Sequence, residues 1–305
     1  MRDTVSSVPL FYSIIMKKLM IFLLTLVLIS SCQRFNNADK KANHAERIVL
    51  ISKQYTEIIH ALGAEKDVVA VDLSSIYPEK VKKLPTVGYH RALSIEGLLA
   101  AKPTLIMHDG INSLGPDHIV KQIMDLEIPM KTFHTKAKDV ASTKALIHEI
   151  ANYFHKEAAA DSLCKILDNQ INEARKNATK FTEKPRVLVV HFGRASNVYL
   201  VMSNGGAVGK MIAWAGAEMA VPDTSGMQHL SAEIISEYNP DVILLTDYGY
   251  DRLGSDEKIK ELPGISSTAA ALNNRIYRVN ECDMVYLGPR SGAITLALQK
   301  LIHQR

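Results

Sequence analysis

Four side chains that can bind a metal or an anion stand within eight residues of one another in the stretch LPTVGYHRALSIEG. They are Tyr89, His90, Arg91 and Glu96, and the glycine and proline before them indicate a turn. A tyrosine phenolate is a hard anionic oxygen that binds ferric iron, and a bound metal lowers the phenol pKa from its ordinary value of about 10. A surface loop or a packed tyrosine gives the same pattern, so these residues alone leave a metal site and a plain turn as alternatives.

His191 is a second candidate ligand because of its place in the predicted fold. The chain contains eleven histidines, and no two of them are spaced i, i+4 on an evident site helix. His191 follows the apolar run PRVLVV, and ligands of open α/β sheets bind beyond the carboxyl ends of the strands. His108 has a similar position after PTLIM. For any single histidine, a place on the surface or in the core remains the competing interpretation.

The sequence contains no constellation typical of an enzyme. The motifs G-x-S-x-G and H-E-x-x-H are absent, and no pair of catalytic carboxylates is evident. The stretch SNGGAVGKM fails as a phosphate-binding loop, because Asn204 replaces its first glycine and Met211 replaces the required serine or threonine. We interpret it as a turn followed by a packing helix, and we expect no enzymatic activity.

Short apolar strands alternate with helical stretches from Arg47 onward, which predicts an α/β fold with mostly parallel sheets covered on both faces. The strands form two series, 47–52, 67–72 and 103–109, then 185–193, 197–201, 240–247 and 275–281. Between the series, apolar residues recur at helical spacing on either side of His155. We therefore expect two Rossmann-like lobes joined by one long helix, with the N-terminal lobe at 47–155, the linking helix at 156–182 and the C-terminal lobe at 183–305.

The two halves also share an internal repeat. EIIHALGAE at 57–65 resembles KMIAWAGAE at 210–218, and each half contains Leu-Ser-x-Glu ten residues before a proline that opens an apolar strand. Ser94 and Ser231 are good N-caps, which places Glu96 and Glu233 in first helical turns. The helix dipole alone favours a carboxylate there. One glutamate at an equivalent place in each lobe also suits docking on a partner with pseudo-two-fold symmetry.

The N-terminal segment has the features of a bacterial lipoprotein signal. From Met16 to Cys32 it reads MKKLMIFLLTLVLISSC, with two lysines, an apolar run too short to span a bilayer, and small residues before a cysteine. We expect translation to start at Met16, residues 1–31 to be removed as a signal peptide, and Cys32 to be acylated. The polar residues 32–46 then form a tether at the periplasm or cell surface. A signal peptide with a chance cysteine is the alternative.

Charge and cysteine content exclude further classes. The formal net charge is +4, which is too small to indicate a nucleic-acid partner. Cys164 and Cys282 lie far apart without C-x-x-C spacing. Neither a thiolate zinc site nor a redox pair is predicted.

Over nearly its whole mature length the chain resembles the haemin-binding lipoproteins of bacterial haem ABC importers. The resemblance rests on RIVLISKQYTEIIHALGAEKDVVAVD, on the string G-Y-x-R-x-L-S-x-E-G that begins at Gly88, and on LPGISSTAAALNNRIYRVNE and LGPRSG. The wider group comprises the periplasmic binding proteins with a single helical backbone (class III), which also bind siderophores and cobalamin. The resemblance implies that same two-lobed fold here.

The resemblance also implies roles for individual residues of the cleft. Tyr89 matches the axial ligand of the haem iron, and Arg91 would stabilise the phenolate or a haem propionate. His191 stands close to a second ligand that some relatives have. The match there is loose, because Phe192 and Arg194 follow it where relatives have glycines. Arg194 is a further candidate partner for a propionate.

Glu96 and Glu233 match glutamates that meet arginines of a permease dimer, and Cys32 matches the lipidated cysteine. The implied function is capture of ferric haem between the lobes and delivery to an ABC importer permease with its ATPase subunits. Haem is then the transported ligand. The protein would act as a monomer and could receive haem from an outer-membrane haem receptor system. Two alternatives remain, a ferric-siderophore or cobalamin receptor of an ABC importer, and a haem carrier or adhesin without a transporter.

Overall fold

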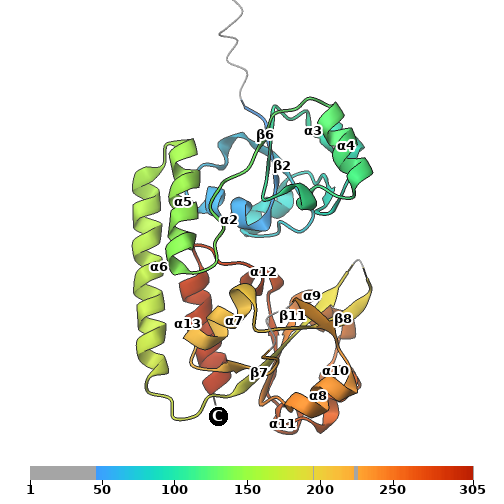
Figure 1. Ribbon diagram of the computed structural model, residues 1–305, viewed down its shortest axis with the longest axis vertical. Coiled ribbons are helices and arrows are strands. Elements are labelled where there is room, and N and C mark those ends of the chain that lie inside the picture. Colours follow the sequence, from blue (N-terminus) through green and yellow to red (C-terminus); the bar gives the residue numbers. More distant parts are fainter. Residues whose placement is uncertain (1–45, 195, 223–225, 305) are drawn as a thin grey trace, which may run out of the picture. The chain divides into compact units, whose positions relative to one another are not determined.

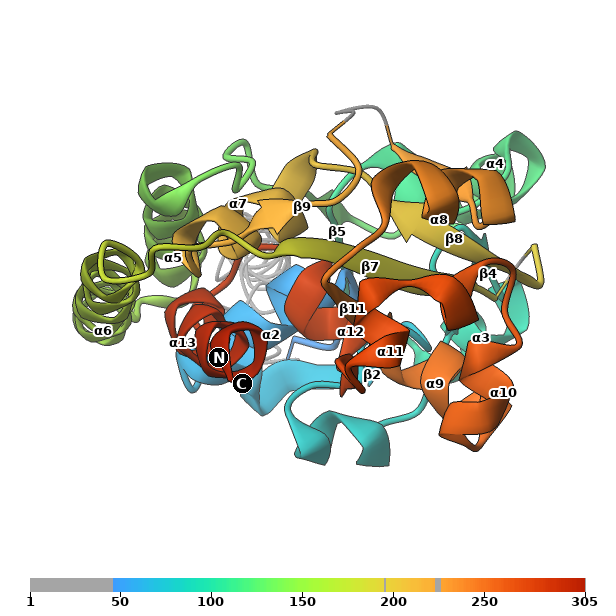
Figure 2. The same cartoon turned by 90° about the horizontal axis from the view of Figure 1, so that it is seen from below.

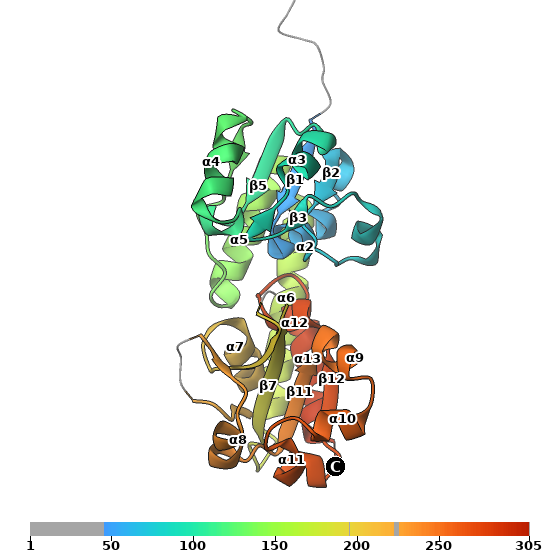
Figure 3. The ribbon, with the colours of Figure 1, turned by 90° about the vertical axis from the view of Figure 1, so that its right-hand side faces the viewer.

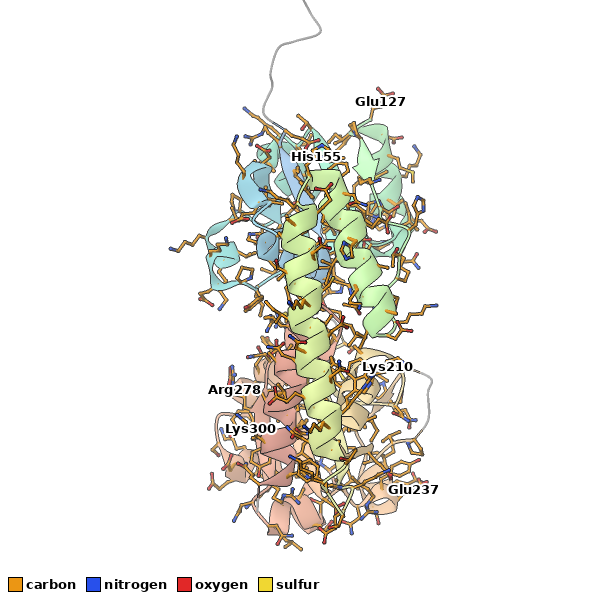
Figure 4. The ribbon with its side chains drawn as sticks, turned by 90° about the vertical axis from the view of Figure 1, so that its left-hand side faces the viewer. Glu127, His155, Lys210, Glu237, Arg278 and Lys300 are labelled. Carbon is orange, nitrogen blue, oxygen red and sulfur yellow. The ribbon has the colours of Figure 1, made fainter. Side chains whose placement is uncertain are left out.

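Each lobe is built around a sheet of buried apolar strands, and one long helix runs alongside both lobes (Figures 1 and 4). The computed structural model describes residues 46–194, 196–222 and 226–304. The predicted α/β fold of two lobes and a connecting helix is confirmed. Within these ranges no helix is both long and apolar enough to cross a membrane. The start at Met16, the signal peptide and the acylation of Cys32 concern residues outside the described ranges.

The N-terminal lobe contains a four-stranded parallel sheet in the order β2–β1–β5–β6. Side chains of the central strand alternate between two faces, so Ile48 and Leu50 pack in one core cluster and Val49 and Ile51 in another. The elements are β1 (Ile48–Ile51), α2 (Lys53–Ala61), η1 (Glu65–Asp67), β2 (Val68–Val71), η2 (Glu79–Lys83), β3 (Gly88–Tyr89), β4 (Ala92–Leu93), α3 (Ile95–Ala101), β5 (Leu105–His108), η3 (Ile111–Ser113), α4 (Asp117–Asp125), β6 (Met130–Lys131) and α5 (Val140–Phe154).

The C-terminal lobe contains a six-stranded sheet in which β7, β11 and β12 run parallel, as does β9 beside β7. Strand β8 runs antiparallel to both of its neighbours, β7 and β10. Only residues 194–197 separate β7 from β8. Two parallel strands need a crossover connection of a dozen residues or more, so this short loop makes β8 antiparallel to β7. The elements are β7 (Arg186–Gly193), β8 (Val198–Met202), α7 (Gly206–Trp214), β9 (Glu218–Met219), β10 (Met227–His229), α8 (Ala232–Tyr238), β11 (Val242–Thr246), α9 (Asp247–Leu253), α10 (Asp256–Lys260), η4 (Ile265–Ser267), α11 (Ala269–Leu272), β12 (Ile276–Val279), α12 (Glu281–Met284) and α13 (Ser291–His303).

The connecting helix is α6 (Glu157–Ala178), which is rich in alanine and free of glycine and proline. It is separated from α5 by His155, whose φ of 55° lies in the left-handed region. The N-terminal half of α6 is part of the first lobe's core through Ala160, Cys164 and Leu167. Farther along, Gln299 of α13 donates to the carbonyl of Ala174 at 2.9 Å, and α13 lies beside α6 (Figure 2). The helix is thus packed against both lobes.

The internal repeat corresponds to equivalent local structures. Ser94 accepts a hydrogen bond from the Gly97 N–H at 3.0 Å, and Ser231 accepts one from the Ile234 N–H at 3.3 Å. The helices that they cap, α3 and α8, both end on a left-handed residue, and β5 and β11 follow them. Both predicted N-caps are therefore confirmed.

Candidate functional site

Tyr89 is positioned by a tight hairpin of the N-terminal lobe. Strands β3 and β4 pair Tyr89 with Ala92, which leaves His90 and Arg91 as a two-residue turn. Gly88 has a φ of +95°, and a Cβ there would lie 2.8 Å from the Ser94 nitrogen, so the hairpin requires glycine. The turn predicted from Pro85 and Gly88 is this hairpin.

A small pocket, with a cavity volume of about 10 Å³, brings Tyr89 together with the C-terminal lobe. It is lined by Ser74, Ile76, Tyr89, Arg194, Glu281 and Cys282. Of the residues proposed from sequence to meet the ligand, Tyr89 and Arg194 line this pocket. Arg91 is exposed and donates its backbone N–H to the Ser113 carbonyl at 2.8 Å, and it is not among the lining residues.

An ion pair that the sequence reasoning missed crosses the cleft beside Tyr89. Nζ of Lys53, the first residue of α2, lies 2.6 Å from Oε1 of Glu281, the first residue of α12. Burial alone would lower the pKa of Lys53, but the Glu281 carboxylate outweighs it and raises this pKa above its ordinary value. Burial alone would raise the pKa of Glu281, and Lys53 lowers it below its ordinary value. Both groups are therefore charged near neutral pH.

The positions of Lys53 and Glu281 in the sequence, each just after a strand, are a signal that could have marked them as site residues. Lys53 follows β1 and Glu281 follows β12, at the ends of parallel strands where ligands of such sheets bind. His191 lies behind this pair, with Nδ1 3.8 Å from Glu281 Oε2, too far for a hydrogen bond. Burial lowers the pKa of His191, so its imidazole is neutral near pH 7.

Several buried polar atoms near the strand ends have no hydrogen-bond partner within the described protein. They include Nδ1 of His90, His108 and His191, Nε of Arg194 and Oγ1 of Thr246. Buried polar groups in native proteins are nearly always paired with protein, water or ligand. These groups are therefore able to hydrogen-bond to a polar ligand or to ordered water.

Aromatic side chains border Arg194 on the C-terminal lobe. The Phe192 ring lies 4.9 Å from the Tyr199 ring and 5.6 Å from the Tyr248 ring, centroid to centroid. The Arg194 guanidinium lies 4.2 Å from the centroid of the Tyr248 ring. Tyr248 remains 40% exposed. This group offers flat apolar surface next to a cation.

His90 packs directly on Tyr89, so it is more than a turn residue. The two rings lie 4.3 Å apart at an angle of 47°. His90 Nδ1 also lies 3.8 Å from the buried carboxylate of Asp72. Within the described residues, no group of three or more His, Cys, Asp or Glu side chains could hold a bare metal ion.

The segment between α12 and α13 lies next to α2 of the other lobe (Figure 3), and buried side chains join the two. The Glu57 side chain is 2% exposed and accepts from the Tyr286 hydroxyl at 2.7 Å and from Arg290 Nη2 at 2.8 Å. Arg290 Nη1 also lies 2.7 Å from Asp283 Oδ1. The lobes are thus held together by two sets of charged contacts, the pair of Lys53 with Glu281 and this Glu57 network.

Glu96 and Glu233 lie in the first turns of α3 and α8, and both are exposed. Among the described residues, neither carboxylate has a hydrogen bond or ion pair that a permease would need to break. Cys32, the expected lipidation site, lies outside the described residues.

Two α/β lobes, a rigid connecting helix and a pocket at the strand ends define a substrate-binding protein of the two-lobed class. The chain belongs to the periplasmic binding protein family, which it matches over residues 48–281. It is therefore a substrate-binding protein of an ABC importer and not an enzyme.

Among solved structures, the chain is similar to the periplasmic heme-binding protein RhuT from Roseiflexus sp. RS-1 in its apo form. The two are 31% identical, with a TM-score of 0.75 over 85% of this chain and 98% of RhuT. Among curated proteins, the substrate-binding lipoprotein YvrC of Bacillus subtilis, named an uncharacterized ABC transporter component, is 26% identical over 80% of this chain and 76% of its own. The vitamin B12-binding protein of Pectobacterium atrosepticum is 24% identical over 85% and 88%.

Proposed function

We propose that this protein captures ferric haem between its lobes and delivers it to the permease of an ABC importer. The observation that carries the proposal is the position of Tyr89, which lines a pocket opposite Arg194 of the other lobe. A phenolate favours Fe(III), and neighbouring cations stabilise its negative charge. Similarity to RhuT, whose name describes heme binding, supports the same ligand.

The surroundings of Tyr89 suit an amphipathic macrocycle. Ile76 lines the pocket, the exposed Tyr248 ring provides apolar surface next to Arg194, and Arg194 can pair with a propionate. The pocket has a cavity volume of only about 10 Å³, far below the roughly 300–1,000 Å³ of sites that enclose drug-sized ligands. Haem entry therefore requires the lobes to separate by a hinge movement about the α6 connection.

The first experiment is a haemin titration of purified protein with Cys32→Ser, followed by Soret absorption. The matched variants are Tyr89→Phe and Tyr248→Phe, which each remove one phenol oxygen from opposite sides of the cleft. We expect saturable binding by the parent protein, and loss of the tyrosinate-type spectrum only in Tyr89→Phe. If the parent shows no saturable Soret change, the haem proposal fails. If Tyr248→Phe loses the spectrum instead, the assignment of the ligand to Tyr89 is wrong.

His191 as a second iron ligand is a narrower proposal. Its imidazole is neutral, as metal binding requires, but Glu281 stands between it and the pocket. Coordination by His191 would need Glu281 to move. A change of the haem spectrum in His191→Ala from six-coordinate to five-coordinate is the result we expect if it ligates.

Cobalamin is the second candidate ligand, because the vitamin B12-binding protein of Pectobacterium atrosepticum is similar over most of both chains. A cobalamin site has no need of the Tyr89 phenol. Calorimetric titrations with haemin and with cyanocobalamin, under the same conditions, separate the two candidates. Binding of cyanocobalamin that is unchanged in Tyr89→Phe, together with weak haemin binding, would favour this alternative.

Docking on the permease is assigned in this proposal to Glu96 and Glu233. The test is uptake by the reconstituted importer with the double variant Glu96→Ala, Glu233→Ala. The matched control is Glu127→Ala, Glu237→Ala, which also removes one exposed carboxylate from each lobe (Figure 4). We expect the first pair to abolish uptake with haem affinity intact and the control pair to leave uptake unchanged. Equal effects of the two pairs would contradict specific docking.

A further inference from the structure

The ligand pocket contains a carboxylate that belongs to the protein itself. Glu281 lines the pocket together with Tyr89 and Arg194, and its side chain is only 12% exposed. Oε1 accepts a hydrogen bond from Lys53, whose side chain is 16% exposed. A charged carboxylate at the place where a ligand binds calls for an explanation, because burial of charge costs free energy unless the charge is paired.

Cationic groups act on Glu281 from both lobes. Lys53 and Arg194 both act electrostatically on Glu281, from opposite lobes, while the neighbouring His191 is neutral. Nε of Arg194 is buried without a hydrogen-bond partner in the described protein. The Lys53 ammonium also interacts electrostatically with Tyr89. Lys53 and Arg194 are therefore the cations that a ligand carboxylate can meet at this pocket.

We infer that Glu281 is a built-in counter-ion that occupies the place of a carboxylate of the ligand. On binding, the ligand carboxylate takes Lys53 from Glu281, and the ion pair that closes the cleft beside Tyr89 is broken. This inference rests on the proposed function and narrows it, because it assigns specificity for tetrapyrroles with free carboxylates. Glu281 lowers the affinity for every such ligand, and release becomes easier because Glu281 is available to recapture Lys53.

The test compares haemin with haemin dimethyl ester, which lacks ionisable carboxylates, on the full-length protein with Cys32→Ser. Glu281→Gln keeps the shape and a hydrogen-bond acceptor for Lys53 but removes the competing charge. We expect the ratio of haemin affinity to ester affinity to rise about tenfold, since a hydrogen bond to a charged group is worth roughly that factor. Lys53→Met should lower the ratio of haemin affinity to ester affinity about tenfold.

The matched control is Glu57→Gln, which breaks the other charged contact between the lobes without touching the pocket lining. We expect Glu57→Gln to change the affinities for haemin and for the ester by the same factor, because it alters only how easily the lobes separate. If Glu281→Gln improves both ligands equally, or improves neither, the counter-ion role is overturned. Thermal unfolding of each variant checks its fold, and Glu281→Asp, with its shorter reach, is the second variant and should shift haemin affinity in the same direction.

These outcomes separate the inference from the proposed function. If the parent protein and all variants fail to bind haemin, the haem proposal fails and this inference with it. If the parent binds haemin and the ratio of haemin to ester affinity is the same in Glu281→Gln, only this inference is overturned.

Discussion

Gly88 is the residue on which the position of Tyr89 depends. Its φ of +95° is unfavourable for other residues, and a Cβ would lie 2.8 Å from the backbone nitrogen of Ser94. We predict that Gly88→Ala lowers the free energy of unfolding by about 3 kcal/mol, because strain and a backbone clash add. Urea unfolding measures the change, and haemin titration should show weaker binding because the hairpin shifts.

Gly63 provides the matched control for Gly88. Its φ is +63°, and nothing lies within 4 Å of the Cβ that alanine would add. Gly63→Ala therefore tests the left-handed backbone without the clash, and it should cost about 1 kcal/mol. If the two substitutions cost the same, the close approach of Ser94 does not constrain the hairpin.

Single residues of the site differ in how far the sequence predicts them. Tyr89 is recognisable because it stands in a dense polar string after a turn, and Arg194 because it follows a strand. Lys53 and Glu281 also follow strands, but a lysine or a glutamate at a strand end is commonly a surface residue, and the sequence does not show that these two meet. Only the fold, which brings them together over 228 positions of sequence, shows that they form a pair.

At the scale of elements, the repeat of α3 in α8 makes an internal comparison possible. Each helix ends on a left-handed residue, Lys102 with a φ of 47° and Asn239 with a φ of 32°. Lys102→Gly should stabilise the protein by about 0.5–1 kcal/mol, because glycine removes the strain. Urea unfolding of the variant checks this value.

The equivalent substitution in the second lobe, Asn239→Gly, should lower the free energy of unfolding instead of raising it. Asn239 tolerates the left-handed region, and its side-chain oxygen accepts from the Ala269 N–H at 3.1 Å. Asn239→Gly loses this hydrogen bond and should destabilise by about 0.5–1 kcal/mol. A gain of stability in both variants would show that this hydrogen bond contributes nothing.

The elements themselves follow from sequence where apolar periodicity is strong. Every strand of the two predicted series is present, because buried strands need continuous β-branched and aliphatic residues. The direction of β8 is not predictable from its own residues, since VYLVM suits either orientation. The direction of β8 follows from the short connection of residues 194–197 that precedes it. Connection length is therefore the physical information that composition alone lacks.

At the scale of the whole molecule, the Glu57 network joins the two lobes. Glu57 is buried, and Arg290 supplies the cation that compensates its charge. We predict that Arg290→Met lowers the free energy of unfolding by about 3 kcal/mol, as loss of one partner of a buried pair does. The comparison is Arg278→Met, whose exposed pair with Asp251 should contribute about 0–1 kcal/mol. Similar losses in urea unfolding would contradict a special role for the network.

The stability of the whole fold should fall in acid, because burial lowers the pKa of several histidines in both lobes. They are His60, His90, His108, His191 and His303. When the pKa of a histidine is lower in the folded state, the unfolded chain binds more protons than the folded protein at a pH between the two pKa values. The stabilising contribution is then fully present above the unfolded pKa of about 6.5 and is lost as pH falls toward the folded pKa.

His108 is the position at which this dependence can be measured. Its side chain is 4% exposed at the end of β5, and the nearby charges are Asp109, which favours the protonated form, and Lys136, which opposes it. Wild-type protein should show a urea midpoint that is steady above pH 7 and falls as pH drops from about 6.5 to 5. His108→Gln should reduce that fall, because glutamine takes up no proton, whereas His118→Gln, at an exposed position, should not. An identical pH dependence of the urea midpoint in wild type and His108→Gln would mean that the acid sensitivity arises elsewhere.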